Sequence, residues 1–287
     1  MVAKMMDGKK LANERYLSRS QYMRKAVYKK PCLAIISVGS DAASDVYIRN
    51  KQQACDKLNI DCLIIKKSYT HENIEDGTAQ CNLRYTIEEL NNADRITAIM
   101  VQLPLPKGLD SHEVLNYISP SKDVDGLTDI NMGSLVTSHG CYNIAPCTPK
   151  GIIELLLEEG ICLRGKEAVI VGRSNIVGKP MAALLLRRDC TVTVCHSYTE
   201  NLAQHTRSAD ILIVAVGKAG FITKDMVKPG AVVIDVGINR ADGKIVGDVM
   251  PDVAEVAGYM TPVPGGVGPM TVSCLMENVL NIAIKNK

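Results

Sequence analysis

The chain has 287 residues, of which 46% are hydrophobic and 22% charged, and its formal net charge is +2. This length suits about two domains of roughly 150 residues, and the apolar fraction is too high for a disordered chain. The nearly balanced charge gives no electrostatic footprint for nucleic acid. The apolar runs are shorter than the roughly 18–20 residues that cross a bilayer, so the sequence predicts no membrane segment.

The amino terminus and the cysteines are those expected of a protein in the cytoplasm. Residues 1–16 carry charges of both signs and no apolar stretch, which argues against a secretory signal and against a mitochondrial presequence. The ten cysteines include no CxxC pair, and none of the five histidines lies at metal-ligand spacing from another histidine or a cysteine pair. We therefore expect a cytoplasmic protein without a metal site.

In the first half of the chain, apolar runs alternate with helical stretches. The pattern predicts strands at 33–38, 62–66 and 96–102, and helices at about 42–58, 87–92 and 111–118. Fully apolar strands that alternate with helices are typical of a parallel sheet covered on both faces. The segment 103–151 is rich in Pro, Gly, Asp and Thr and lacks periodicity, so we expect functional loops or a connection between domains there.

The same alternation resumes in the second half. It predicts strands at 168–172, 191–196, 211–216 and 231–236, and helices at 149–159, 179–188, 202–208 and 271–283. This rhythm is that of a nucleotide-binding fold. The predicted fold class is α/β, with two parallel-sheet domains around a cleft, the second of them Rossmann-like.

A glycine-rich segment, Val171–Pro180, joins a predicted strand to a predicted helix. A phosphate at such a junction would meet backbone N–H groups and the positive end of the helix dipole. The spacing is not the usual G-x-G-x-x-G, because Ser174 stands at the middle glycine position. Arg173 follows the first glycine, and the next strand ends at His196-Ser197, where an NAD-selective site carries Asp or Glu. Arg, His and Ser can bind a 2′-phosphate, so these residues favour NADP over NAD.

Ser44, Tyr47 and Lys51 lie on the first long predicted helix. Tyr47 and Lys51 are one helical turn apart and share a face. A solvent-facing pair is the more frequent explanation of this pattern, and a lysine that acts as a base needs burial or a nearby cation. Short-chain dehydrogenases carry the same spacing after their dinucleotide fold; here it precedes that fold, so that interpretation fails.

Two further segments combine polar groups with rigid backbone. Gln102 ends an apolar run before a proline turn, and Lys122–Gly126 offers two carboxylates without the spacing of a calcium loop. A single aspartate there could bind a heterocycle that presents an N–H beside an amino group. The loop Thr261–Thr271 places glycines between prolines, which suits either a planar ligand or a structural hinge.

With these segments in view, the chain resembles the bifunctional methylenetetrahydrofolate dehydrogenase/cyclohydrolase family of one-carbon metabolism. The similarity runs from Met6-Asp7-Gly8-Lys9 to the last helix. The blocks that carry it are long and nearly uninterrupted: residues 43–51, 101–106, 122–126, 146–149, 172–180, 228–238 and 261–271.

The resemblance implies a folate-binding catalytic domain, residues 1–147, with the last helix, residues 270–287, packed back on it. It implies a Rossmann-like NAD(P)-binding domain at residues 148–269. It also implies a homodimer that binds NAD(P) and a tetrahydrofolate derivative, with or without a polyglutamate tail. The implied chemistry is oxidation of 5,10-methylenetetrahydrofolate to the methenyl compound and hydrolysis of that compound to 10-formyltetrahydrofolate.

The resemblance also assigns residues to roles. Lys51 would be the catalytic lysine, assisted by Tyr47, Gln102 and Asp125. Substrate-binding positions would be Ser44, Tyr47, Gln102, Leu103, Asp125, Pro264 and Gly265. Cofactor-binding positions would be Thr148, Gly172, Arg173, Ser174, His196, Ser197, Ile238 and Thr271.

The chain departs from the family after Asp125-Gly126, where Leu127-Thr128-Asp129 replaces the common Phe-His-Pro beside the pterin. This leaves the balance of the two activities open, and one alternative is a dehydrogenase with weak or absent cyclohydrolase activity. A folate- and nucleotide-binding protein without turnover is another. The presence of Lys51, Gln102 and Asp125 argues against a binding protein, because such a protein needs no lysine at the reactive carbon.

Overall fold

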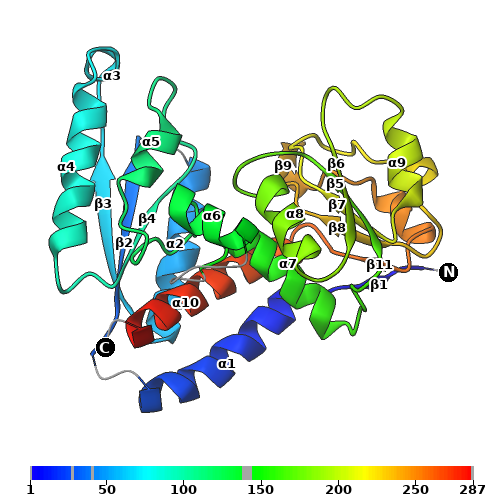
Figure 1. Cartoon of the computed structure of the whole chain (residues 1–287), viewed down its shortest axis with the longest axis horizontal. Helices are drawn as coiled ribbons and strands as arrows, with labels where there is room; N and C mark the ends of the chain where they lie inside the picture. The colour runs from blue at the N-terminus through cyan, green and yellow to red at the C-terminus, as the bar shows by residue number, and fades with distance from the viewer. Residues whose placement is uncertain (1, 27–28, 40–41, 138–143, 286–287) are drawn as a thin grey trace. The chain divides into compact units, whose positions relative to one another are not determined.

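The computed structural model describes residues 2–26, 29–39, 42–137 and 144–285, without the side chains of residues 19–26, 42 and 43 (Figure 1). Contacts within the chain divide it into two compact units. The first, which we call the six-stranded unit after its sheet, combines Met1–Glu14 with Pro146–Cys274. The second, which we call the three-stranded unit, combines Arg15–Ala145 with Leu275–Lys287. The predicted fold class, two α/β units with parallel sheets, is confirmed.

The units divide the chain differently from the predicted domains of residues 1–147 and 148–269. Met1–Glu14 lies in the six-stranded unit, because strand β1 (Lys4–Met5) pairs with β11 (Tyr259–Met260). Helix α10 (Val267–Lys285) contributes to both units, and its residues from Leu275 onward lie in the three-stranded unit. Pairings between residues far apart in the sequence set these boundaries.

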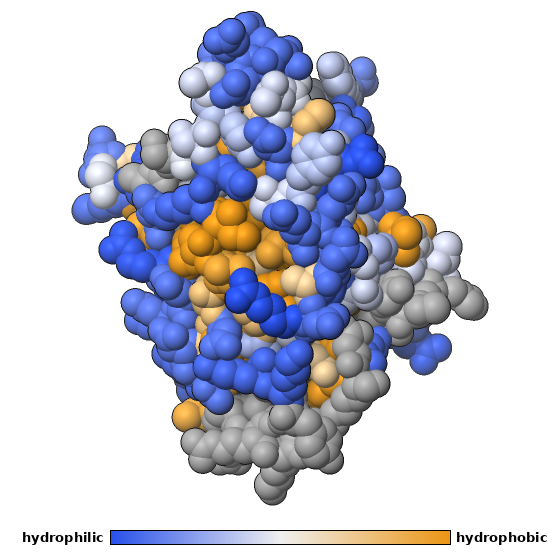
Figure 2. All heavy atoms as spheres, turned by 90° about the vertical axis from the view of Figure 1, so that its left-hand side faces the viewer, coloured by the Kyte–Doolittle hydropathy of each residue, from blue (hydrophilic) through white to orange (hydrophobic). Residues whose placement is uncertain are grey.

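The sheet of the three-stranded unit is parallel, with the order β3–β2–β4. β2 (Cys32–Val38) lies in the middle, and β3 (Asp61–Lys67) and β4 (Ala98–Val101) lie at the edges. The interior of β2 is buried along its length, as its continuous apolar run predicts. The apolar residues of β3 are half-exposed. Figure 2, which views this side of the molecule, shows apolar side chains gathered within a largely hydrophilic face.

Two helices, α4 and α2, lie on opposite sides of this sheet (Figure 1). α4 (Thr78–Asn92) packs Leu83 and Ile87 against Ala34 and Ile36 of β2, in a cluster that α5 (Ser111–Asn116) completes. α2 (Ala42–Lys57) contacts α10 where the Cys55 thiol donates to Met276 Sδ at 3.6 Å. The other helices are α1 (Gly8–Ala26), α3 (His71–Glu75) and α6 (Asp129–Thr137).

α10 is, among the described residues, the one helix long and apolar enough to cross a membrane by length and composition alone. Leu275, Met276, Val279 and Leu280 of this helix are buried within the protein. The core helix of a folded protein passes the same test, so the burial of these side chains accounts for the composition of α10.

The sheet of the six-stranded unit is also parallel, with the order β1–β11–β8–β7–β5–β6. β8 (Val232–Asp235), β7 (Ile211–Val214) and β5 (Glu167–Val171) lie in its interior, and β6 (Thr191–Cys195) lies at one edge, beside β5. The chain runs from β5 to β6 and then returns to place β7 on the other side of β5. In open α/β sheets, ligands bind at the carboxyl ends of the strands where the order reverses in this way.

Helices and short elements complete this unit. The helices are α7 (Cys147–Glu158), α8 (Gly178–Leu186) and α9 (Leu202–Ser208), with 3₁₀ turns η1 (Lys224–Met226) and η2 (Pro251–Glu255). β9 (Asn239–Ala241) and β10 (Lys244–Val246) form an antiparallel hairpin. An apolar cluster that includes Val169, Leu212 and Val233 fills the interior.

Two buried aspartates hold the loops that follow β7 and β8. The carboxylate of Asp248 accepts the backbone N–H groups of Val216, Gly217 and Lys218 at 2.7–2.9 Å. The carboxylate of Asp235 accepts those of Gly237, Asp248 and Val249 at 2.9–3.0 Å. Burial raises the pKa of Asp235 to about 6, since desolvation opposes its charged form. These carboxylates fix the backbone at the carboxyl end of the sheet.

Candidate functional site

Lys51 and Gln102 are in direct contact inside the three-stranded unit. The Lys51 Nζ atom donates a hydrogen bond to Gln102 Oε1 at 2.7 Å. Lys51 is 7% exposed and Gln102 9%, so the contact is nearly closed to water. The solvent-facing arrangement that the bare pattern favoured is therefore wrong for Lys51. A buried amine in contact with a side-chain amide is the arrangement expected of a lysine that handles a proton.

The two side chains come from different elements at the carboxyl end of the sheet. Lys51 lies on α2, and Gln102 follows β4, where its backbone N–H donates to Ile36 O at 2.8 Å. The amide of Gln102 is oriented by a second bond, in which Nε2 donates to Leu103 O at 2.7 Å. The Leu103–Pro104 peptide bond that follows is cis. Gln102 therefore presents its Oε1 atom to the lysine in a fixed orientation.

Tyr47 and Ser44 precede Lys51 on the same helix, one and two turns earlier. Both are half-buried. Because helix positions three and four residues apart share a face, the three side chains form one row along α2. The structure thus places on one helix face the residues that the sequence predicts there.

The segment Lys122–Gly126 separates its two carboxylates into different environments. Asp123 is 1% exposed and accepts hydrogen bonds from the Gly126 and Thr128 backbone N–H groups, both at 2.9 Å, and from Asn131 Nδ2 at 2.8 Å. Asp123 is therefore occupied in holding the turn. Asp125 is half-buried. Of the two acids that the sequence offers, Asp125 is the one with a side chain partly open to solvent.

This segment runs beside the strand that leads to Gln102. Ile99 of β4 pairs in parallel with Asp123, and Val124 N donates to Ile99 O at 3.4 Å. The parallel register brings Asp125 to the same end of the sheet as Gln102. Asn278 of α10 stabilises the segment, since its Nδ2 donates to Val124 O at 2.9 Å. Lys51, Gln102 and Asp125 thus come from three segments to one end of the sheet.

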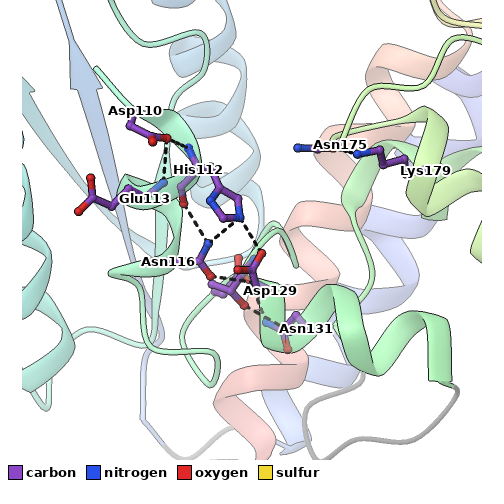
Figure 3. A network of polar contacts seen from close by, with 10 residues as sticks. Asp110, His112, Glu113, Asn116, Asp129, Asn131, Asn175 and Lys179 are labelled. Atoms are coloured by element: carbon purple, nitrogen blue, oxygen red, sulfur yellow. Dashed lines mark hydrogen bonds and ion pairs between the residues drawn. The ribbon is translucent and has the colours of Figure 1, made fainter. Parts of the chain in front are cut away.

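The residues that replace Phe-His-Pro each have a structural use, and Figure 3 shows the contacts of the last of them, Asp129. Leu127 packs on the apolar cluster beneath the sheet. The hydroxyl of Thr128 accepts the N–H of Asn131 at 3.4 Å in the first turn of α6. Asp129 contacts His112 Nε2 at 2.9 Å through Oδ1, and its N–H donates to Asn116 Oδ1 at 2.9 Å. The departure from the family pattern therefore leaves a well-anchored loop after Asp125.

The glycine-rich segment of the six-stranded unit forms a tight cradle between β5 and α8. A Cβ atom on Gly172 would lie 2.3 Å from Ala215 O, and one on Gly178 would lie 2.1 Å from Gly172 O. The hydroxyl of Ser174 accepts the N–H groups of Val177 and Gly178 at 3.2 and 3.4 Å. The two glycines let the backbone segments of this loop pack closely and leave the beginning of α8 without bulky side chains. A loop of this kind, at the point where the strand order reverses, fits the phosphates of a dinucleotide.

The predicted ribose-proximal residues lie on neighbouring loops. Gly172 N donates to Cys195 O at 2.9 Å, which joins the loop after β5 to the loop after β6. Arg173 and Ser197 are exposed, and His196 is half-buried. The structure thus brings together the cationic and polar groups that the sequence singles out around a 2′-phosphate.

The remaining predicted positions also lie in the six-stranded unit. The hydroxyls of Thr148 and Thr271 are 3.0 Å apart, and Ile238 is 50% exposed after the carboxyl end of β8. Pro264 follows a cis peptide bond, and Gly265 has a φ angle of +114°. Pro264 and Gly265, predicted for substrate, therefore share a unit with the cofactor positions.

Sequence reasoning missed the anchoring residues. The apolar runs pointed to the loops after β7 and β8 but gave no sign that Asp235 and Asp248 hold them. The residue pattern alone could not separate Asp123 from Asp125, because both lie in one short acidic turn, and only the family resemblance pointed to Asp125. Among the described residues, no three His, Cys, Asp or Glu side chains are grouped so that they could hold a metal ion.

Two family models match the chain. The catalytic domain of tetrahydrofolate dehydrogenase/cyclohydrolase matches residues 6–125, and the NAD(P)-binding domain of the same family matches residues 146–287. The bifunctional protein FolD of Moorella thermoacetica is 49% identical over 287 residues, which cover 99% of this chain and 99% of that protein.

Solved structures agree over the whole chain. The bifunctional FolD enzyme of Campylobacter jejuni superposes with a TM-score of 0.92 at 41% identity and covers 99% of this chain and 100% of its own. The Trypanosoma brucei enzyme, solved with NADP and an inhibitor, gives a TM-score of 0.90 at 34% identity, covering 100% and 99% of the two chains. The chain therefore belongs to the tetrahydrofolate dehydrogenase/cyclohydrolase family and has both activities of that name.

Proposed function

We propose that this chain oxidises 5,10-methylenetetrahydrofolate with NADP and hydrolyses the resulting 5,10-methenyltetrahydrofolate to 10-formyltetrahydrofolate, with Lys51 as the general base. The observation that supports this most directly is the 2.7 Å contact between Lys51 Nζ and Gln102 Oε1 in a nearly closed site. A dehydrogenase without the hydrolytic step, or a binding protein without turnover, would have no use for this pair.

Hydrolysis requires a base beside the methenyl carbon. The positive charge of the methenyl group disfavours the ammonium form of a neighbouring lysine, so that Lys51 can accept a proton. The amine takes this proton as the water oxygen bonds to the carbon. The ammonium then gives a proton to the folate nitrogen N5 as the carbon–N5 bond breaks, and the hydroxyl of the adduct loses its proton to the amine, which leaves the formyl group on N10. Gln102 and Tyr47 orient the amine and the water. General-base catalysis of this kind contributes about 10²–10⁴-fold.

Oxidation needs mainly alignment. NADP, when bound, accepts the hydride from the one-carbon unit. The cradle of Gly172 and Gly178 would hold its phosphates, and Thr148, Ser174, Ile238 and Thr271 would complete its binding site. Asp125 would hold the pterin through the amino and ring N–H groups, and Ser44, Leu103, Pro264 and Gly265 are the other residues proposed to bind substrate. Such positioning is worth roughly 7–11 kcal/mol of the barrier.

The preference for NADP over NAD follows from the loops after β5 and β6. An NAD-selective site places a carboxylate on the ribose, which would repel a 2′-phosphate. Arg173, His196 and Ser197 stand in those loops, and each can donate a hydrogen bond to a phosphate oxygen. We expect Arg173 to contribute most to the preference for NADP, because its guanidinium can donate two hydrogen bonds to one phosphate.

A spectrophotometric assay with purified protein tests the function. Methylenetetrahydrofolate is supplied with NADP or with NAD, and the reduced cofactor and the methenyl compound are followed separately. We expect faster reduction of NADP and no accumulation of the methenyl compound. Accumulation of that compound would show a dehydrogenase alone, and faster reduction of NAD would contradict the cofactor assignment.

Replacing Asp125 by alanine should weaken folate binding. The substitution removes a charged acceptor from the pterin, and a hydrogen bond to a charged group is worth about 1.5–3 kcal/mol, or roughly 10- to 150-fold in Kd. Folate binding is measured by fluorescence titration or calorimetry. Asp94→Ala, which removes an exposed acid from a turn of the same unit, serves as the control. Unchanged folate affinity in Asp125→Ala would remove the anchoring role.

We further propose a cytoplasmic homodimer. All cysteines among the described residues are free thiols, as is usual where glutathione keeps proteins reduced. Sedimentation of the purified chain tests the dimer. The preferred length of the folate's glutamate tail can be measured in the same assay with mono- and polyglutamylated substrates.

A further inference from the structure

One exposed aromatic ring lies beside the predicted ribose site. Tyr198, in the turn after β6, is 80% exposed. The Arg173 guanidinium carbon lies 5.7 Å from the centre of its ring, within the range of a cation–π contact. The ring of His196 meets it edge-on, with centroids 6.2 Å apart and an interplanar angle of 68°. A large ring left in solvent thus contacts two of the residues assigned to the 2′-phosphate.

The turn that carries Tyr198 is fixed by its own hydrogen bonds. His196 N donates to Thr199 Oγ1 at 2.8 Å, and Thr199 N donates to His196 O at 2.9 Å. Tyr198 N donates to His196 Nδ1 at 3.2 Å. Since Nδ1 is an acceptor here, Nε2 is the ring nitrogen that can donate to an anion. The position of the Tyr198 ring therefore follows from the backbone of the turn.

Arg173 lacks this kind of support from its own loop. It follows Gly172 directly and is exposed, and a long arginine side chain gives up about 2 kcal/mol of rotamer freedom when it becomes fixed on a ligand. A contact that already restricts the guanidinium before binding lowers that cost. The Tyr198 ring, held by the neighbouring strand's turn, is placed to make that contact.

We propose that Tyr198 is a positioning residue that holds the Arg173 guanidinium beside His196 and Ser197, and so increases the preference for a nucleotide with a 2′-phosphate. The inference rests on the proposed NADP dependence. The contact concerned is that of Arg173 with the 2′-phosphate. NAD cannot make this contact, because it has a hydroxyl in place of the phosphate. Substitution of Tyr198 should therefore affect the two cofactors differently.

The test compares kcat/KM for NADP and for NAD in the wild type, Tyr198→Ala and Tyr198→Phe. We expect Tyr198→Ala to lower the NADP/NAD ratio of kcat/KM about two- to fivefold, mainly by raising KM for NADP. A change of this size corresponds to the free energy of an exposed cation–π contact. Tyr198→Phe should keep the wild-type ratio, because the contact uses the ring and not the hydroxyl. Tyr85→Ala, which removes a tyrosine that is 66% exposed on α4, is the matched control.

A double-mutant cycle separates positioning from a general effect on folding. In an Arg173→Ala background, Tyr198→Ala should leave the NADP/NAD ratio unchanged, since the side chain that it positions is gone. Equal losses with both cofactors, a ratio unchanged by Tyr198→Ala, or additive effects in the double variant would each overturn the inference. A wild type without preference for NADP would overturn the cofactor proposal and this inference together, whereas the other outcomes leave the cofactor proposal intact.

Discussion

Replacing Lys51 by methionine should reduce hydrolysis of methenyltetrahydrofolate by about 10²–10⁴-fold, the usual contribution of general-base catalysis. Methionine keeps an unbranched chain in the buried space but has no group that accepts a proton. Oxidation of methylenetetrahydrofolate should fall less, because that step depends on alignment and not on this base. The methenyl compound should then accumulate during turnover, and its absorbance is the measurement.

Two controls make this result specific to the base. Lys57→Met changes an exposed lysine at the end of the same helix and should leave hydrolysis unchanged. Thermal unfolding of Lys51→Met shows whether α2 still packs, because loss of the bond leaves Gln102 Oε1 without its lysine donor, at a cost of about 1–3 kcal/mol. Hydrolysis at the wild-type rate in a folded Lys51→Met protein would show that another group removes the proton.

The predicted strands agree with the structure most closely where neighbouring elements bury an apolar run. β2, β5 and β7 each contain four or more consecutive apolar residues, which would be exposed to water in a surface loop. Helix ends were less predictable. α4 begins at Thr78, whereas the sequence predicted its start near Ile87. The prediction missed the first turns because they expose polar residues and bury only Ala79 and Leu83. So few apolar residues give too weak a helical periodicity to predict the start of the helix from the sequence.

Elements stabilised by distant partners left no pattern to predict. β1 is a two-residue strand, Lys4–Met5, whose side chains are exposed and which exists because β11 offers it a parallel partner. Among the described side chains of α1, few are buried, Leu11 and Ala12 being two of them. Pairing and packing across the sequence, and not local periodicity, therefore decide where these segments lie.

The candidate site was predictable in its residue types and not in its contacts. A strand that ends in Gln102 and a helix that carries Lys51 both follow from the sequence, whereas their 2.7 Å hydrogen bond depends on how α2 packs against the sheet. The acidic turn shows the same limit. Only the backbone conformation reveals that Asp123 accepts the N–H groups of its own loop and is buried, whereas Asp125 is half-buried.

Replacing Gly172 by alanine should abolish cofactor binding and the dehydrogenase activity that depends on it. Gly172 has a φ angle of +126°, a conformation that L-residues rarely adopt, and a Cβ atom there would lie 2.3 Å from Ala215 O. The strain and the overlap together cost about 3 kcal/mol or more, and the loops after β5 and β7 must move apart to relieve them. Calorimetric titration with NADP and the rate of NADP reduction are the measurements.

Gly160→Ala is the matched control for this substitution. Gly160, which follows α7 in the same unit, also has a positive φ angle, +68°, but a Cβ atom there meets no atom within 4 Å. It should cost about 1 kcal/mol of stability and leave NADP binding unchanged. Hydrolysis of methenyltetrahydrofolate should survive Gly172→Ala better than oxidation does, because Lys51, Gln102 and Asp125 belong to the three-stranded unit. If Gly172→Ala binds NADP as tightly as the wild type, the cradle between β5 and α8 is not where the cofactor's phosphates lie.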